Sequence, residues 1–296
     1  MMIFSGSSNK LLTQKIAKGI DLKLSSLEVF IFPDGERRIR IIEKVLGEDT
    51  VVVQSTSSPT DINYMELFLI VDGLKRSGAK SVTLVLPYFG YQRQDHVFRE
   101  GEAVSAKVIT KILEIVGIDK LIMVDLHSLK IKELFNIPVV HLSAIGLFAK
   151  VILEKGLDKD STLVSPDMGG IRRIKILSEM LGNMPFAIIE KNRDLATGAV
   201  SASKIQGEVK KNVVIVDDMI SSGGTIAMAS KILKDHGAQN ISVFATHAVF
   251  SEKAPKILEE SPVKSVYVTD TIFVPENKIF PKLKILSIAG MIAEVL

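Results

Sequence analysis

Apolar, strand-like runs alternate with amphipathic segments along almost the whole chain. Runs such as "VTLVL" and "VVIV" are apolar throughout, which is typical of strands buried on both faces of a sheet. The segments 63–77, 103–116 and 225–236 have the apolar spacing of helices. This alternation predicts an α/β fold with parallel sheets covered by helices on both faces. The predicted strands are 2–5, 28–31, 51–54, 82–86, 121–124, 162–164, 186–189, 213–216, 241–246 and 265–268.

The chain also repeats itself. "LKRSGAKSVTLVLPYF" (74–89) is similar to "LKDHGAQNISVFATHAVF" (233–250), and each copy follows a strand, a serine-containing turn and a helix. We therefore predict two similar Rossmann-like domains in tandem, 1–145 and 146–279. We also expect the tail 280–296 to join the first domain. Coincidence between two common helix–glycine–strand units is the alternative.

Charge and cysteine content narrow the class of protein. The 37 basic and 34 acidic residues leave a net charge of +3, which gives no case for a general nucleic-acid binder. The chain has no cysteine, which excludes disulfides and Cys-ligated zinc and favours an intracellular compartment. We see no signal peptide and no apolar run of the roughly 18 residues that a membrane helix needs. We expect a cytoplasmic protein without a membrane or nucleic-acid partner.

The stretch "VVIVDDMISSGGT" (213–225) carries the strongest functional signal. Asp217 and Asp218 are predicted at the carboxyl end of a strand, where ligands bind in parallel α/β sheets. Small residues opening a helix let backbone N–H groups point at one anion, and paired carboxylates suit vicinal hydroxyls or a hydrated Mg²⁺. A sugar phosphate fits both halves, although ordinary strand-end acids and a plain turn remain the alternative. The turn comprises Ser221, Ser222, Gly223, Gly224 and Thr225.

This stretch resembles the phosphoribosyl-diphosphate-binding signature of type I phosphoribosyltransferases. "FPDGERRIRI" (32–41), "YFGYQRQD" (88–95), "DLHS" (125–128) and "VSPDMGG" (164–170) resemble the ribose-phosphate diphosphokinase family, in order along the chain. The resemblance implies two phosphoribosyltransferase-like domains, of which the first is a degenerate copy on the ATP side. It also implies transfer of the β,γ-diphosphate of ATP to the C1 hydroxyl of ribose 5-phosphate, with release of AMP and a requirement for Mg²⁺.

The resemblance assigns roles residue by residue. It makes Lys191 and Arg193 catalytic, at the root of a closing lid (194–207). The loop that begins at Phe32 would reach a neighbouring subunit's active site, so a homo-oligomer, at least a dimer with shared sites, is expected. The implied ATP-binding residues are Phe32, Asp34, Glu36, Arg93 and Gln94. The implied ribose 5-phosphate-binding residues are Arg193, Asp217, Asp218, Ser221, Ser222, Gly223, Gly224 and Thr225. The implied metal-associated residues are His127 and Asp167.

The chain departs from the family pattern in two places. Ser221 stands where many members have a third acid, so a general base at that position is not expected here. The segment "HVFREGEAVSA" (96–106) is poor in basic residues, which predicts altered regulation and an archaeal-type member. Two other functions stay open: a phosphoribosyltransferase that consumes the diphosphate, and a non-catalytic, synthetase-associated regulatory homologue.

Overall fold

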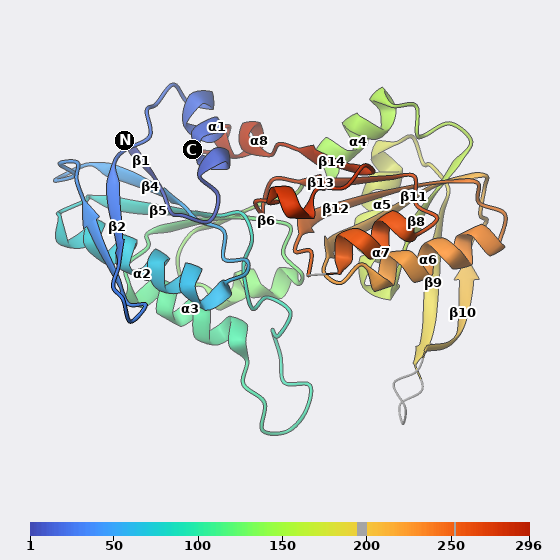
Figure 1. Ribbon diagram of the computed structural model, residues 1–296, viewed down its shortest axis with the longest axis horizontal. Coiled ribbons are helices and arrows are strands. Elements are labelled where there is room, and N and C mark those ends of the chain that lie inside the picture. Colours follow the sequence, from blue (N-terminus) through green and yellow to red (C-terminus); the bar gives the residue numbers. More distant parts are fainter. Residues whose placement is uncertain (194–199, 252) are drawn as a thin grey trace. The chain divides into compact units, whose positions relative to one another are not determined.

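The computed structural model describes residues 1–193, 200–251 and 253–296, which form two compact units (Figure 1). Unit 1 comprises Met1–Leu142, Thr271–Phe273 and Ser287–Leu296. Unit 2 comprises Ser143–Asp270 and Val274–Leu286. Each unit is an α/β structure around a sheet of mainly parallel strands, as the alternating sequence pattern predicts.

The sheet of unit 1 has the order β1-β4-β5-β6-β7, and each neighbouring pair is parallel. Parallel neighbours require crossover connections, which the helices of this unit supply. Its elements are β1 (Met2–Ser5), α1 (Lys10–Gly19), β2 (Leu27–Ile31), β3 (Arg37–Ile41), β4 (Asp49–Val53), α2 (Thr60–Arg76), β5 (Ser81–Leu86), α3 (Ser105–Ile115), β6 (Lys120–Val124), the 3₁₀ helix η1 (Leu129–Leu134), β7 (Val139–Leu142) and α8 (Ala289–Ala293).

The main core of unit 1 lies between this sheet and helices α2 and α3. Helix α2 buries Leu67, Val71 and Leu74, whose spacing places them on one helical face. They share a cluster with Leu84 of β5, and the other face of the sheet carries α1 and α8, which lie side by side (Figure 1). The sequence therefore predicts the helices at 63–77 and 103–116 to within a few residues.

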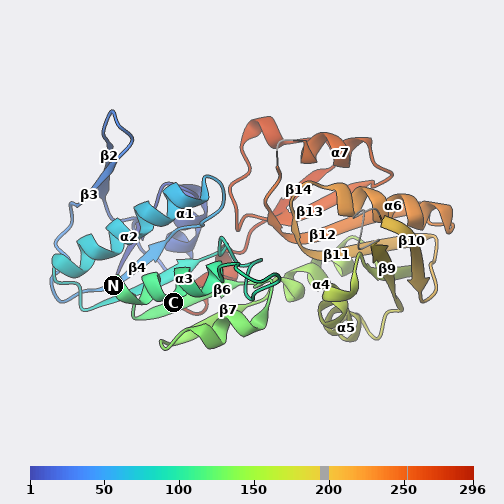
Figure 2. The same cartoon turned by 90° about the horizontal axis from the view of Figure 1, so that it is seen from below.

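A separate antiparallel hairpin, β2–β3, belongs to unit 1 and projects away from its sheet (Figure 2). The predicted strand 28–31 is part of this hairpin and not of the parallel sheet. Its five-residue connection, 32–36, is too short for the crossover that a parallel neighbour would need. Strand β3 escaped prediction because arginines separate its apolar residues Ile39 and Ile41.

The sheet of unit 2 has the order β10-β9-β8-β11-β12-β13-β14. All neighbours are parallel except the edge strand β10, which pairs antiparallel with β9. Its elements are α4 (Ile145–Glu154), β8 (Ser161–Ser165), the 3₁₀ helix η2 (Met168–Gly170), α5 (Ile171–Met180), β9 (Phe186–Arg193), β10 (Val200–Gln206), β11 (Asn212–Ile220), α6 (Gly224–Asp235), β12 (Asn240–Ala248), α7 (Ala254–Glu260), β13 (Ser265–Thr269), the 3₁₀ helix η3 (Glu276–Lys278) and β14 (Leu283–Leu286).

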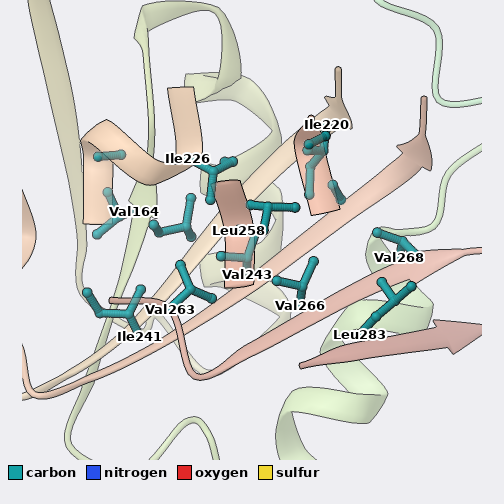
Figure 3. Packing of buried hydrophobic residues seen from close by; sticks show 14 of the residues in the cluster. Val164, Ile220, Ile226, Ile241, Val243, Leu258, Val263, Val266, Val268 and Leu283 are labelled. Carbon is teal, nitrogen blue, oxygen red and sulfur yellow. The ribbon is translucent and has the colours of Figure 1, made fainter. Parts of the chain in front are cut away.

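Strand β11 lies in the middle of unit 2 and is buried on both faces. Val213 and Ile215 pack with residues of α6 and α7, in the cluster that Figure 3 shows. Val214 and Val216 point to the opposite side, where they pack with α4 and α5. The uninterrupted apolar run "VVIV" is therefore the signature of a central strand, as predicted.

Two further findings concern predictions about other segments. Of the segment 194–207, where the family resemblance implies a closing lid, residues 200–206 form strand β10 and residues 194–199 lie outside the described part of the chain. None of the helices in the described residues combines the length and apolar character that crossing a bilayer demands.

Candidate functional site

Two acids on β11 form the centre of the site in unit 2. The sequence predicted a strand that ends at residue 216, with Asp217 and Asp218 after it. The strand instead continues to Ile220, so both acids lie within it. Strand β11 extends beyond β8 on one side, since their pairing stops at Ile215. On its other side β11 stays paired with β12 as far as Ile220. The acids therefore lie at the open carboxyl edge beyond β8, where parallel α/β sheets bind ligands.

The two carboxylates are held by their own backbone. The N–H of Asp218 donates to Oδ1 of Asp217 at 2.9 Å, and the N–H of Met219 donates to Oδ1 of Asp218 at 3.0 Å. Both side chains are largely buried. Burial and the charge of Asp218 raise the pKa of Asp217 well above its ordinary value, and Asp167 adds to the rise while Arg173 opposes it. This acidic cluster suits a ligand that brings hydroxyl donors or a cation.

Arg173 is a site residue that the sequence reasoning missed. Its Nη1 lies 3.8 Å from Oδ1 of Asp217, and the Arg173 side chain is only 17% exposed. It lies in the first turn of α5, which follows β8 and η2 directly. A basic residue soon after the "SPDMGG" segment was the available signal, since that segment follows the strand beside β11.

The segment after β8 places Asp167 beside this pair. The Asp167 carboxylate Oδ1 accepts the N–H of Gly169 at 2.9 Å, and Ser165 Oγ donates to the Asp167 carbonyl at 2.7 Å. A Cβ at Gly170 would lie 2.4 Å from Ser165 Oγ, so a glycine is needed for this close approach. The turn therefore fixes Asp167 at the same edge as Asp217.

The loop that follows β11 leads into an open helix terminus. Gly223 has φ +78°, and α6 begins at the next residue without a side-chain cap. Ser222 Oγ lies 3.4 Å from the N–H of Gly224, a long contact, and both Ser222 and Thr225 are exposed. Backbone N–H groups at an uncapped helix start, with hydroxyls beside them, form a ready anion site.

The corresponding loop of unit 1, residues 54–59 between β4 and α2, is filled by its own side chains. Ser55 Oγ donates to the carbonyl of Thr271, and the N–H of Ser55 donates to Ser8 Oγ at 2.9 Å. Thr56 Oγ1 accepts from the N–H of Gly90 at 2.8 Å. Because Ser55 and Thr56 are buried and already bonded, their hydroxyls are not open to an anion in the way that the exposed Ser222 and Thr225 are.

The predicted nucleotide residues of unit 1 lie on the loops after β5 and β6, which are neighbouring strands. Arg93 is exposed, and Gln94 is held by Ser105, whose Oγ donates to Gln94 Oε1 at 2.8 Å. His127 follows β6, and its side chain is exposed. Adjacent parallel strands thus bring Arg93 and His127 to one edge of the sheet.

The hairpin residues form a second group in unit 1. Phe32, Asp34 and Glu36 are exposed at the tip, which projects away from the sheet (Figure 2). The Glu36 N–H donates to Asp34 Oδ1 at 3.1 Å, and the Arg38 guanidinium lies 5.8 Å from the Phe32 ring centroid. The ring is therefore presented to solvent on a supported turn.

The remaining predicted residues are the cationic pair on β9. The backbones of Lys191 and Arg193 pair with Ser203 and Val200 of β10, but their side chains lie outside what the structure describes. The described residues contain no group of three His, Asp or Glu side chains placed to bind a metal by themselves. His127 belongs to unit 1 and Asp167 to unit 2.

Known proteins are similar to this chain over its whole length or nearly so. Residues 1–117 match the N-terminal domain of ribose phosphate pyrophosphokinase, and residues 194–296 match the phosphoribosyl synthetase-associated domain. The ribose-phosphate pyrophosphokinase of Caldanaerobacter subterraneus subsp. tengcongensis is 41% identical over 100% of this chain and 93% of its own length. The chain belongs to the ribose-phosphate pyrophosphokinase family.

Other members of the ribose-phosphate pyrophosphokinase family agree with this assignment. The Fusobacterium nucleatum enzyme of that name is 40% identical over 99% of this chain and 93% of its own. The crystal structure of phosphoribosylpyrophosphate synthetase from Mycobacterium smegmatis has a TM-score of 0.94, with 37% identity, 99% coverage of this chain and 96% of that chain. The family resemblance and the fold class expected from the sequence are thus confirmed.

Proposed function

We propose that the chain transfers the β,γ-diphosphate of ATP to the C1 hydroxyl of ribose 5-phosphate, giving 5-phosphoribosyl 1-diphosphate and AMP. The proposal depends on one observation in unit 2: the buried carboxylates of Asp217 and Asp218 are followed, a few residues later, by the uncapped start of α6. The carboxylates suit the ribose hydroxyls, and the loop from Ser221 to Thr225 suits the 5-phosphate. Membership of the ribose-phosphate pyrophosphokinase family supports both substrates.

ATP is assigned to unit 1. The exposed Arg93 guanidinium can clamp phosphate oxygens, and Gln94 lies next to it on the same loop. Phe32, Asp34 and Glu36 would hold adenine, with the Phe32 ring stacking on the base. Because their hairpin projects from the sheet, we propose that it serves the active site of a second copy, so that the functional enzyme is at least a dimer.

The residues present fit Mg²⁺ as a cofactor. Magnesium keeps several waters and is usually held by one or two carboxylates together with substrate phosphates, so no cage of three protein ligands is required. The candidate ligands are the Asp167 carboxylate in unit 2 and, separately, the exposed His127 imidazole in unit 1. When bound, Mg²⁺ neutralises charge on the triphosphate. We further propose that Lys191 and Arg193 stabilise the charge that develops on the transferred group.

The reaction is tested with ATP labelled at the γ-phosphorus, Mg²⁺ and ribose 5-phosphate. The proposal expects AMP in equal amount with a labelled sugar diphosphate, resolved by ion-exchange chromatography and ³¹P NMR. Label in free phosphate, with ADP, would indicate hydrolysis instead. Product formation from the sugar diphosphate and a nucleobase, without ATP, would indicate a phosphoribosyltransferase. Ligand binding without any turnover would indicate a regulatory homologue.

A further inference from the structure

The loops after β5 and β6 carry exposed side chains whose relative position the sheet alone does not fix. Arg93 and Gln94 lie on the first loop and His127 on the second. Hydrogen bonds across a sheet end with its strands, so residues this far along each loop need other contacts to hold them. The side chains of Gln92 and Asp95, which bracket Arg93 and Gln94, provide such contacts.

Gln92 makes the first contact. It is 1% exposed although Tyr91 and Arg93 beside it are exposed. Its Oε1 accepts the backbone N–H of His127 at 2.8 Å. Since a backbone N–H can only donate, this bond fixes the orientation of the amide.

The same orientation leaves Nε2 of Gln92 as a donor with no partner among the described residues. An unpaired buried donor lowers stability, and such groups in native proteins require an explanation. Packing alone would be served better by an apolar side chain of similar volume. The benefit must therefore come from what Oε1 does, which is to hold the backbone of His127.

Asp95 makes the second contact between the same loops. Its carboxylate accepts hydrogen bonds from the His96 ring at 2.6 Å and from the Ser128 hydroxyl. Burial alone would raise the pKa of Asp95, but these hydrogen bonds outweigh it and lower the pKa. Residues 92 and 95 are thus tied to the adjacent residues 127 and 128.

We propose that Gln92 is a positioning residue: through the backbone of His127, and with Asp95–Ser128 as a second tie, it holds Arg93 and His127 in one fixed relative placement for the nucleotide. The inference rests on the proposed function, which assigns ATP to Arg93 and the metal-associated role to His127. Gln92 itself touches neither substrate. Fixing both side chains before ATP arrives lowers the ordering cost of binding.

The test uses Gln92→Met, which conserves volume, with Gln14→Met, an exposed glutamine on α1, as the matched control. We expect Gln92→Met to raise KM for MgATP about five- to tenfold, the loss of one hydrogen bond, while KM for ribose 5-phosphate is unchanged. The melting temperature should hardly change, because the substitution removes an unpaired donor along with a made bond. Hydrogen exchange at the His127 amide should accelerate in Gln92→Met only.

A double-mutant cycle with His127→Ala decides whether Gln92 acts through His127. We expect Gln92→Met to cause no further rise in KM for MgATP in the His127→Ala background, since Gln92 affects nucleotide binding through His127. Full additivity, or wild-type MgATP kinetics in Gln92→Met, would overturn the inference while leaving the proposed function intact. A wild-type chain that makes no product would instead overturn the proposed function. In that case, titration of both proteins with a non-hydrolysable ATP analogue still decides the inference, by equal or unequal affinity.

Discussion

Nη1 of Arg173 lies 3.8 Å from Oδ1 of Asp217, and both side chains are less than one-fifth exposed. The pair joins the first turn of α5 to the central strand β11. Asp218 and Asp167 both raise the pKa of the Asp217 carboxyl. Among the described side chains, Arg173 lowers it. The ionisation state of the site thus depends on a residue outside the acidic motif.

Replacement of Arg173 should therefore impair the proposed sugar site. Arg173→Met removes the opposing charge, so the pKa of Asp217 rises further and a higher pH is needed to form its carboxylate. We expect KM for ribose 5-phosphate to rise about tenfold, with the activity profile moved to higher pH. Arg172→Met on the same helix, where Arg172 is exposed, is the control. Equal effects of the two substitutions would contradict the assignment.

Replacement of Asp217 should raise the stability of the fold and lower the activity. Its pKa is raised in the folded state, so folding favours the protonated form, and the stability it contributes is lost as pH rises from its ordinary pKa through the raised value. Asp217→Asn removes that loss, so we expect a melting temperature about 2–4 °C higher at pH 7.5, with the gain vanishing near pH 4. Activity should fall sharply.

Thermal unfolding as a function of pH measures this effect. Asp235→Asn, at an exposed position on α6, serves as the control and should change the melting temperature little at either pH. A melting temperature for Asp217→Asn that is lower than wild type at pH 7.5 would refute the electrostatic reading of the site.

Gly223 should be intolerant of a side chain. Its φ is +78°, and a Cβ there would meet Leu258 and Ala254 at 3.3–3.4 Å. We expect Gly223→Ala to lower the free energy of unfolding by about 1–2 kcal/mol and to weaken ribose 5-phosphate binding. Gly146→Ala in helix α4, where the new Cβ meets no atom within 4 Å, should instead raise stability by about 0.5–1 kcal/mol. Denaturant unfolding and isothermal titration measure the two effects.

Lys191 tests the assignment that comes from the family resemblance. We expect Lys191→Ala to lower kcat about a thousandfold with little change in KM for ribose 5-phosphate, because its contacts strengthen in the transition state. Lys204→Ala on β10 is a control at a described, exposed position. If sugar affinity collapses while kcat survives, Lys191 binds substrate and does not stabilise the transition state. Steady-state kinetics separate the two cases.

The sequence revealed the architecture wherever a segment is buried on both sides. The run from Val213 to Val216 indicated a strand buried on both faces, because a half-exposed strand would alternate with polar residues. Strand β3 could not be found in the same way, since its alternating arginines belong to a two-stranded hairpin exposed on one face. The end of β11 was also misplaced, because one neighbour continues to pair with it after the other stops.

The chain alone predicted the chemistry that its site offers. Two carboxylates followed by a turn of small residues suit a sugar phosphate through hydrogen-bonding capacity and backbone freedom, which are local properties. Tertiary structure decided what surrounds those groups. It brought Arg173 to Asp217 and Gln92 to His127, and it filled the loop after β4 while leaving the one after β11 open. Such pairings depend on which strands become neighbours, and no short segment carries that information, because strand order is settled by packing across the whole sheet.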